Sequence, residues 1–464
     1  MSTGAVSARA WAQRIDLAQL AQWLSQRRWY ASKSHHLHEL EIEECALLRD
    51  SPPELLTIAQ AQLSSGEHDL YQLPLSLIDE GGGDADRAVA SAGGLHAVDG
   101  LAQGRCGTLL AEAIAAERTL PGEEGTFNFR RADAGGHPAA GPARPVGAEQ
   151  SHSSLVLGDR TVLKVLRRLE PGVSPELELL RFLSERSFPN VPPLQGFYEY
   201  EGRAFTCTLG IAQRFVGGAV GGFELACSWA QSRPEALVTA LADLGAVTAR
   251  LHNCLASDAS DPAFTPEEPS AESLSLLTAT IDEDIERVFA HLPPDDERLA
   301  PIAGRGQDVR ERINARGHAV PAGRSIRTHG DYHLGQTLRA DGEWQIIDFE
   351  GEPSRPLHER RRKRSPLRDV ASMLRSFAYV DATARAQGGA VADDWEQRAR
   401  ASFMESYLAS IDRTLLPGGE AQILNLLAIF ELEKAVYELR YELDHRPEWL
   451  PIPVAGIVRL LEAD

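Results

Sequence analysis

The sequence predicts an α+β fold with two lobes, of which the first is rich in strands and the second is mainly helical. Three observations predict it. The chain has 464 residues, more than one hydrophobic core usually supports. Apolar residues alternate with polar ones in part of residues 38–78 and around 152–166, which favours strands. From about residue 222 onward the patterns are mainly helical, apart from a short β-like unit around 326–349.

The first predicted part covers residues 1–90. The segment LAQLAQWLSQRRWY places Leu17, Leu20, Ala21 and Leu24 on one helical face, so we expect a helical entry within residues 1–35. The strands LEIEECALL, LLTIAQAQL and HDLYQLPLSL follow. They lead into a glycine-rich loop that marks a boundary near 85–95.

The second predicted part covers residues 91–217, and the third covers 218–464. We expect a helix at 99–120, a Gly/Pro/Ala-rich loop at 131–148 and then a hairpin, SSLVLGDRTVLKVLRR. A helix begins near Ser174, with a proline in its first position. The strand TCTLGIAQRFV then ends in a glycine pair that separates the two lobes.

Composition excludes several classes of partner. The net charge of −20 makes nucleic acid and anionic membrane surfaces poor partners, because both need a basic footprint. No run approaches the ~18 apolar residues of a membrane span, and the N-terminus shows no secretory signal. Five scattered cysteines without metal-like spacing fit a reducing compartment, so we expect the protein in the cytoplasm.

The segment IRTHGDYHLGQTLRADGEWQIIDFEGEP carries the strongest chemical signal. Asp331 lies in a tight loop, Gln336 follows five residues later, and a short strand ends at Asp348, with Glu350 just beyond. Phosphoryl transfer from ATP needs a carboxylate that accepts the proton of the attacking hydroxyl and oxygen ligands that hold Mg²⁺. We therefore predict Asp331 as the catalytic base and Gln336, Asp348 and Glu350 as metal ligands. His329 is interpreted as a prop for the loop, made through a hydrogen bond, and His333 as loop packing.

A second constellation lies upstream. Lys164 stands within the apolar strand TVLKVL, and the next helix offers Glu176 and Glu178, of which Glu178 is the preferred partner. A strand lysine paired with a helix glutamate is the arrangement that binds the α- and β-phosphates in kinases. The phosphate loop is expected at residues 147–154. The predicted nucleotide site also includes Ser151, Ser153, Ser154 and Gln213.

The C-terminal helix FELEKAVYELRYELDHRPEWLPIP places polar and aromatic residues on one face, at i, i+3, i+4, i+7 and i+8. Carbohydrate sites need charged groups for hydroxyls and aromatic faces for sugar rings. A solvated, salt-bridged surface is the alternative. The predicted sugar-contacting residues are Lys434, Tyr437, Glu438 and Tyr441. Glu442 is the internal control, whose loss should do little if its side chain points to solvent.

At these residues the sequence resembles the bacterial maltokinases, which are relatives of the aminoglycoside phosphotransferases. The matching segments are WLSQRRWY, EQSHSSLVLGDRTVLKVLRRLEPGVSPELEL, HGDYHLGQTL, IDFEGEPSRPLHERR with SPLRDVASMLRSF, and LEKAVYELRYELDHRPEWLPIP. The resemblance implies a protein-kinase-like fold with an N-terminal cap, an intermediate nucleotide-binding subdomain and a helical C-lobe. It implies ATP-dependent, Mg²⁺-dependent phosphorylation of maltose to maltose 1-phosphate for α-glucan synthesis, and an association with trehalose synthase.

Other functions stay open at this point. A kinase of another sugar, such as glucosamine, is the first alternative because substrate choice depends on the pocket of the C-lobe. An aminoglycoside phosphotransferase is the second. A non-catalytic pseudokinase is the third, although the intact Lys164, Asp331, Gln336 and Asp348 argue against it.

Overall fold

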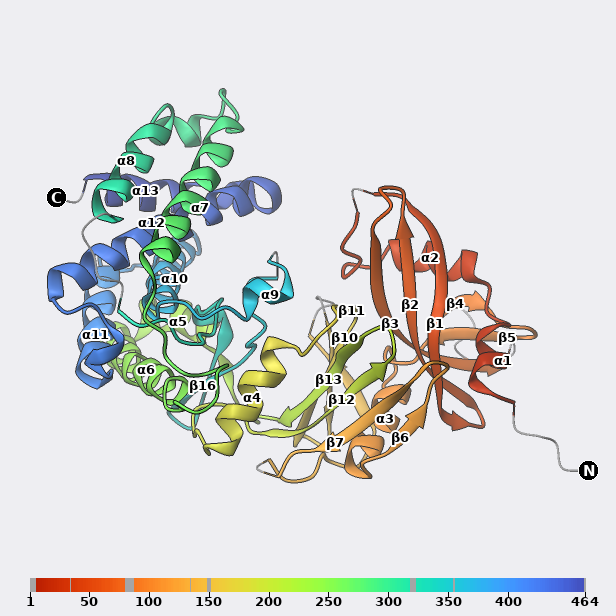
Figure 1. The fold of residues 1–464 in the computed structure, drawn as a ribbon. Helices are drawn as coiled ribbons and strands as arrows, with labels where there is room; N and C mark the ends of the chain where they lie inside the picture. The colour runs from red at the N-terminus through yellow and green to blue at the C-terminus, as the bar shows by residue number, and fades with distance from the viewer. Residues whose placement is uncertain are drawn as a thin grey trace, which may run out of the picture. The chain divides into compact units, whose positions relative to one another are not determined.

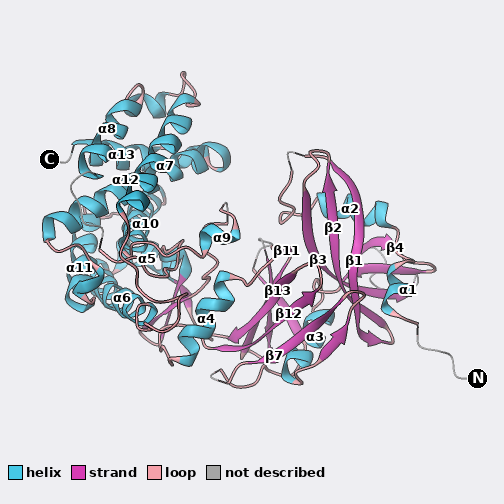
Figure 2. Ribbon diagram, viewed as in Figure 1, coloured by secondary structure: helices cyan, strands magenta, loops and turns pink. Residues whose placement is uncertain are grey.

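The computed structural model describes residues 6–33, 35–79, 87–133, 135–147, 152–317, 323–353 and 355–462, the side chains of 271–277 and 315–317 excepted. The chain divides into two compact units, Met1–Gly217 and Gly218–Asp464 (Figure 1). Strands dominate the first unit and helices the second (Figure 2). The predicted α+β fold is thereby confirmed.

The first sheet of the N-terminal unit is antiparallel and has the strand order β1-β2-β3-β5-β4, with β11 paired to β3. Helices α1 (Ala8–Ala12) and α2 (Leu17–Ser25) accompany it, and Leu20 and Leu24 of α2 are buried, as the helical stripe predicts. Because β5 ends at Asp99, this sheet extends beyond the predicted boundary at residue 90. The strands of this sheet are β1 (Leu37–Asp50), β2 (Pro53–Leu63), β3 (His68–Asp79), β4 (Ala88–Ser91), β5 (Leu95–Asp99) and β11 (Arg168–Leu169).

The second sheet has the order β6-β7-β12-β13-β10-β9-β8. Its strands are β6 (Thr119–Pro121), β7 (Gly125–Arg131), β8 (Ala143–Val146), β9 (His152–Leu157), β10 (Thr161–Leu166), β12 (Leu194–Gly202) and β13 (Thr206–Arg214). Two helices belong to this part of the unit, α3 (Arg105–Ala115) and α4 (Pro175–Glu185). Pro175 occupies the start of α4, where its missing N–H costs no hydrogen bond.

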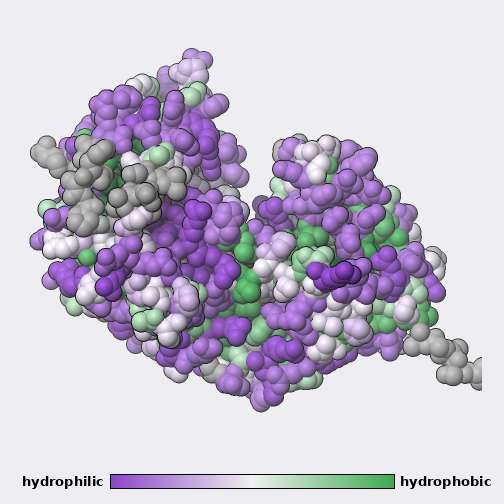
Figure 3. Space-filling model, viewed as in Figure 1, coloured by the Kyte–Doolittle hydropathy of each residue, from purple (hydrophilic) through white to green (hydrophobic). Residues whose placement is uncertain are grey.

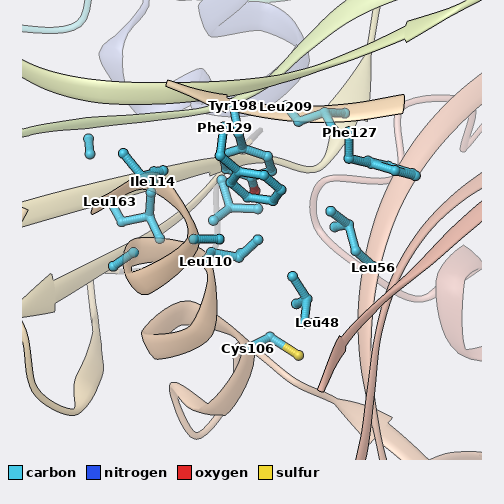
Figure 4. Packing of buried hydrophobic residues seen from close by; sticks show 14 of the residues in the cluster. Leu48, Leu56, Cys106, Leu110, Ile114, Phe127, Phe129, Leu163, Tyr198 and Leu209 are labelled. Atoms are coloured by element: carbon cyan, nitrogen blue, oxygen red, sulfur yellow. The ribbon is translucent and has the colours of Figure 1, made fainter. Parts of the chain in front are cut away.

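One hydrophobic core joins the two sheets of this unit. Leu56 of β2 and Leu110 of α3 belong to the same buried cluster as Phe127, Phe129 and Tyr198 of the second sheet (Figure 4). The rings of Phe129 and Tyr198 stack with their centroids 5.1 Å apart. Helix α3 therefore packs between residues of both sheets, and neither sheet buries its inner face alone.

The C-terminal unit is helical except for one small antiparallel sheet, β14-β15-β16. That sheet comprises β14 (Val220–Gly221), β15 (Thr337–Ala340) and β16 (Glu343–Ile346). The helices are α5 (Gly222–Ser232), α6 (Pro234–Leu255), α7 (Ala271–Ala290), α8 (Gly306–Gly317), α9 (Leu357–Arg360), α10 (Leu367–Ala386), α11 (Trp395–Ser410), α12 (Glu420–His445) and α13 (Pro451–Glu462). Short 3₁₀ turns are η2 (Glu297–Ile302), η3 (Leu334–Gln336), η4 (Arg413–Leu415) and η5 (Pro447–Trp449).

Hydrophilic residues cover much of the face of each unit that Figure 3 shows. Within the described ranges, none of the helices combines the length and the hydropathy needed to cross a lipid bilayer.

Candidate active site

The loop that carries Asp331 comes directly before the β15–β16 hairpin of the C-terminal unit. Gly330 has a left-handed φ of +86°, which a residue with a Cβ adopts only with strain. His333 caps the turn η3, because its Nδ1 accepts a hydrogen bond from Gly335 N at 3.0 Å. Asp331 thus lies between this glycine and the capped turn that leads into β15.

Asp331 is held by two cationic or ionisable neighbours. Lys434 Nζ, from α12, lies 3.2 Å from Asp331 Oδ1. His333 Nε2 lies 3.7 Å from Oδ2, so His333 contacts the carboxylate and does more than the loop packing that was predicted. Burial alone would raise the pKa of Asp331, but Lys434 and His333 outweigh burial and hold this pKa well below its ordinary value. The carboxylate is therefore ionised and can accept a hydrogen bond from a hydroxyl.

Lys434 bridges Asp331 to a second carboxylate. Its Nζ lies 3.5 Å from Glu352 Oε1 and 4.6 Å from the ring centroid of Tyr437. Burial would lower the pKa of Lys434, yet the charges of Asp331 and Glu352 raise it above the ordinary lysine value. Glu352 was not predicted from the sequence, although it lies in the segment EGEPSRPL.

Asp369, near the start of α10, fixes the backbone of the catalytic loop. It accepts hydrogen bonds from His329 N at 2.8 Å and from Gly330 N at 3.0 Å. Its Oδ2 also lies 3.2 Å from His252 Nε2, and His252 Nδ1 lies 3.0 Å from the hydroxyl of Tyr407. Sequence reasoning assigned no role to Asp369. The available signal was a carboxylate in the first turn of an amphipathic helix, and only the structure shows that this carboxylate is buried.

His329 ties the loop to the strand that delivers Asp348. Its Nε2 donates to Ile347 O at 2.9 Å, and its Nδ1 accepts from Asp331 N at 3.4 Å. These two bonds need a neutral ring with its proton on Nε2. Burial lowers the pKa of His329 and keeps it neutral. The interpretation of His329 as a hydrogen-bonding prop is confirmed.

Three predicted metal ligands lie at the end of this hairpin. Ile347 N donates to Gln336 O at 3.0 Å, so Gln336 stands opposite the residue that precedes Asp348. Asp348 has a left-handed φ of +66°, and carboxylate oxygens of Asp348 and Glu350 lie within 4.8 Å of each other. Two half-buried carboxylates at this separation, with a nearby amide residue, provide the hard oxygen donors that suit Mg²⁺.

In the N-terminal unit, Lys164 forms its ion pair with Glu176, whose Oε2 lies 2.8 Å from Nζ. The preference for Glu178 as partner is corrected. Residues two apart on a helix point to different faces, and the face of α4 that carries Glu176 is buried. Both members of the pair are buried, so the ion pair is held firmly in position.

The other predicted nucleotide residues have varied surroundings. Ser151 lies outside the described residues. Ser153 Oγ accepts a hydrogen bond from Arg167 Nε at 2.8 Å, and Ser154 stands opposite Lys164 on the neighbouring strand. Gln213 Nε2 donates a hydrogen bond to Pro192 O at 2.9 Å, so the amide nitrogen of Gln213 is engaged by the backbone before β12. A role for these residues in binding nucleotide stays a prediction.

A cavity of about 310 Å³ opens within the C-terminal unit, beside the catalytic loop. Gly330, Glu352, Lys434 and Tyr437 all line it. The predicted sugar residues Lys434 and Tyr437 are thus brought to one cavity, next to Asp331.

The remaining predicted sugar residues of α12 lie elsewhere. Glu438 is buried, and its Oε2 accepts hydrogen bonds from Arg375 Nη2 and Nε at 2.6 and 3.0 Å. Glu442 is buried as well and accepts from the hydroxyl of Tyr379 at 3.0 Å, so it does not point to solvent. Tyr441 is 41% exposed and stacks on His445, away from the cavity wall. The predicted sugar contacts of Glu438 and Tyr441 are therefore corrected: a side chain committed to an ion pair in the core, or turned to solvent, is not presented to the cavity.

The fold, with its loop of Asp331 and its hairpin ending at Asp348, defines a kinase-like phosphotransferase that uses a hydroxyl group as acceptor. Residues 142–403 match the model of the phosphotransferase enzyme family, and the chain belongs to this family. Residues 23–102 match the maltokinase N-terminal cap domain, which agrees with the resemblance of the sequence.

Several known proteins are similar to the chain. A glucosamine kinase of Streptacidiphilus jiangxiensis is 27% identical over 411 residues, which cover 83% of this chain and 90% of the relative. A glucosamine kinase of Mycolicibacterium smegmatis is 27% identical over 337 residues, covering 69% of this chain and 79% of that protein. A solved glucosamine kinase superposes with a TM-score of 0.71 at 20% identity, covering 96% of this chain and 99% of that one. A second, in complex with glucosamine, ADP and inorganic phosphate, gives 0.68 at 21% identity, covering 95% and 99%. These structures establish the likeness of fold.

Proposed function

We propose that this protein phosphorylates maltose at its anomeric hydroxyl with ATP, giving maltose 1-phosphate for α-glucan synthesis. The observation that carries the proposal is the Asp331–Lys434 ion pair beside a cavity that Tyr437 lines. This places an ionised proton acceptor, a hydrogen-bond donor and an aromatic face around one space. Such a mixture suits a sugar hydroxyl and a sugar ring better than it suits an apolar acceptor.

In the proposed reaction, Asp331 accepts a hydrogen bond from the anomeric hydroxyl and takes its proton as the oxygen attacks the γ-phosphorus. A new O–P bond forms while the bond from the γ-phosphorus to the bridging oxygen breaks, and ADP leaves. Lys434 keeps Asp331 ionised before the transfer. Asp369 and His329 hold the loop so that the carboxylate does not have to reorganise during the step.

Gln336, Asp348 and Glu350 would hold Mg²⁺, which supplies positive charge to the phosphates of ATP when it is bound. In the N-terminal unit, the Lys164–Glu176 pair offers an ammonium for the α- and β-phosphates. The glutamate fixes the direction of the lysine side chain, so that binding the nucleotide costs less side-chain entropy.

The charge of the cavity wall supports a neutral acceptor. The cations that line the wall are Arg355, Arg360, Arg364, Arg368, Lys434 and Arg440, and the carboxylates are Asp284, Glu352, Glu359, Asp369 and Glu433. An amino sugar is cationic near neutral pH and would need an excess of carboxylates. Among the described residues of this wall there is no such excess, so a neutral sugar such as maltose fits better.

Phosphorylation of glucosamine is the second candidate, because both curated relatives described above are glucosamine kinases. The experiment that separates the candidates measures ADP formation with maltose, glucose, glucosamine and an aminoglycoside, each over a range of concentrations with MgATP. Phosphorus and proton NMR of the product then identify the phosphorylated position. We expect the highest kcat/KM with maltose and a phosphate on the anomeric carbon. A higher kcat/KM with glucosamine would assign the protein to the second candidate.

The same proposal leads to expectations about the cellular location of the protein and about a partner protein. An enzyme that uses ATP and supplies α-glucan synthesis is expected in the cytoplasm. Trehalose synthase is a proposed partner, because a reaction that supplies maltose would gain from proximity to its consumer. Co-purification from the native host, compared with a mixture of the two purified proteins by analytical ultracentrifugation, tests that association.

A further inference from the structure

The cavity beside the catalytic loop has an unusual wall for so acidic a protein. The chain carries a net charge of −20, yet four of the arginines of this wall, at positions 355, 360, 364 and 368, come from one short segment after the Asp348 hairpin. This segment is anchored near its middle, at two neighbouring residues. Arg364 pairs through its backbone with Ile326, and Lys363 Nζ donates to Pro262 O at 2.6 Å.

The carboxylates of the wall are already engaged by other groups. Glu433 pairs with Arg368 and lies 4.0 Å from Arg355 Nη2. Glu352 pairs with Arg355 and Lys434. Glu359 also pairs with Arg355, at 3.3 Å.

The last two carboxylates are engaged elsewhere. Asp369 is occupied by the backbone of the catalytic loop and by His252. Asp284 lies on α7 and pairs with Arg287 at 3.2 Å.

Arg364 is left with an uncompensated charge. Within the described part of the chain it forms no ion pair, and its guanidinium donates one long bond, from Nη2 to the carbonyl of Glu359 at 3.4 Å. Burial, together with the positive charges of Arg368 and Arg355, lowers the pKa of Arg364 to about 10, although Glu433 and Glu352 act in the opposite direction. A half-buried guanidinium among other guanidinium groups gains much from an anion that accepts its hydrogen bonds.

We propose that the wall formed by Arg364 and its neighbours Arg355 and Arg368 is an oxyanion site, which binds a phosphate or a phosphate monoester within the acceptor cavity. A tetrahedral dianion offers several acceptor oxygens to the planar fork of Arg364 and neutralises the local excess of positive charge. The site lies in the same cavity as Lys434 and Tyr437, so an occupied oxyanion site competes with the sugar acceptor. The phosphorylated sugar, which is the product of the proposed reaction, would then inhibit binding of the acceptor as it accumulates.

The test measures binding and needs neither ATP nor maltose, so its outcome is independent of the proposed substrate. Isothermal titration calorimetry follows the binding of inorganic phosphate and of α-D-glucose 1-phosphate to the full chain at constant ionic strength, with sodium chloride as the reference salt. The variant Arg364→Gln should bind both anions about tenfold or more weakly, because it loses a charge-assisted pair of hydrogen bonds. Arg362→Gln is the matched control, since Arg362 is exposed, lies two residues away and is absent from the wall.

A thermal melt separates binding from a purely structural role. The ligand-free Arg364→Gln variant should melt at the same temperature as the wild type or higher, because it loses a repulsive charge. If Arg364→Gln does not fold, Arg364→Lys decides, because it keeps the charge but loses the planar fork and should bind phosphate with clearly reduced affinity. Tighter binding of the sugar phosphate than of inorganic phosphate would identify the phosphate monoester as the natural occupant, and equal binding would identify free phosphate. Wild-type protein that does not distinguish phosphate from chloride, or unchanged affinity in both Arg364 variants, would overturn the proposal.

Discussion

At the scale of single residues, the carboxylate of Asp331 combines burial with two neighbours that favour its charge. An ionised carboxylate accepts a hydrogen bond from the hydroxyl and can then take its proton. A neutral amide of the same shape is too weak a base to take that proton. The variant Asp331→Asn is therefore expected to lower kcat by about 10²–10⁴, the usual contribution of a general base. Nucleotide affinity, measured by titration calorimetry, should be nearly unchanged. Turnover close to that of the wild type would remove Asp331 from the mechanism.

Lys434 controls the proton affinity of Asp331. In the wild type the folded pKa of Asp331 lies below the ordinary value of about 3.9. The pairing therefore stabilises the fold above about pH 3.9, and this contribution is lost as the pH falls through the folded pKa. In Lys434→Met the lysine charge is gone while burial stays, so the pKa of Asp331 should rise.

The measurable consequence is the acid limb of the profile of kcat/KM against pH. In Lys434→Met this limb should move to higher pH than in the wild type. Lys363→Met is the control, because Lys363 pairs with Glu267 and is absent from the cavity wall. An acid limb that stays in place in Lys434→Met would show that this limb does not report Asp331.

Asp348 is the residue on which metal-dependent nucleotide binding is expected to depend most. Its carboxylate lies within 4.8 Å of that of Glu350, so its removal leaves an incomplete set of oxygen donors. Asp348→Ala should weaken MgATP binding strongly, whereas the affinity for ATP in the presence of EDTA should be nearly the same as in the wild type. A Mg²⁺ titration of nucleotide binding that coincides with the wild-type curve would exclude Asp348 as a ligand.

At the scale of elements, α12 has two functional faces that lie side by side. Lys434 and Tyr437 face the cavity, whereas Glu438 and Glu442 pack against Arg375 and Tyr379 of α10. One face of the helix, with two glutamates, therefore supports the fold. The neighbouring face, with Lys434 and Tyr437, lines the cavity. This arrangement explains why a charged residue one turn away from Lys434 has a structural role.

Two substitutions on α12 should separate these faces. Glu438→Ala leaves the buried guanidinium of Arg375 without its carboxylate, which is expected to cost about 3–5 kcal/mol of the free energy of unfolding. Tyr437→Ala should raise the KM for the sugar about tenfold, with a small change in stability, because Tyr437 is only half buried. Urea denaturation and steady-state kinetics measure both variants. A raised sugar KM in a fully stable Glu438→Ala protein would restore Glu438 to the sugar site.

At the scale of the whole molecule, the two sheets of the N-terminal unit share one hydrophobic core, while a second core lies between the first sheet and helices α1 and α2. Leu56 comes from the first sheet and packs in the cluster that contains Leu110 and Phe127. A chain that begins at residue 103 would expose this apolar surface, so we expect it to be insoluble. Leu56→Ala should lower the free energy of unfolding by about 2–5 kcal/mol, as other buried leucines do. Fluorescence-monitored unfolding of the full-length variant and of the wild type measures this loss. A truncated chain that is soluble and folded would show that the second sheet folds without the first.

The sequence by itself determined the features in which the interacting residues are close together along the chain. The α+β fold, the loop of Asp331 and the hairpin that delivers Asp348 follow from turn residues and short apolar strands, whose geometry is local. Gln336 and Ile347 are paired by that hairpin alone. The role of His329 could be predicted for the same reason, because its hydrogen-bond partners belong to the same segment.

Only the tertiary structure decided which side chains far apart in sequence meet. Glu176 rather than Glu178 pairs with Lys164 because the packing of α4 sets the rotation of that helix, and a periodic pattern shows a face but not the atom it meets. The bonds of Asp369 to His252 and to the catalytic loop join residues on separate elements. Likewise, Lys434 and Glu438 are only one helical turn apart. Glu438 is buried against α10, where it forms an ion pair with Arg375, whereas Lys434 lies beside Asp331. The free energy of a charged side chain depends strongly on its burial and on its partner, and neither can be read from the local sequence. For this physical reason the sequence left undecided which residues of α12 support the fold and which line the cavity.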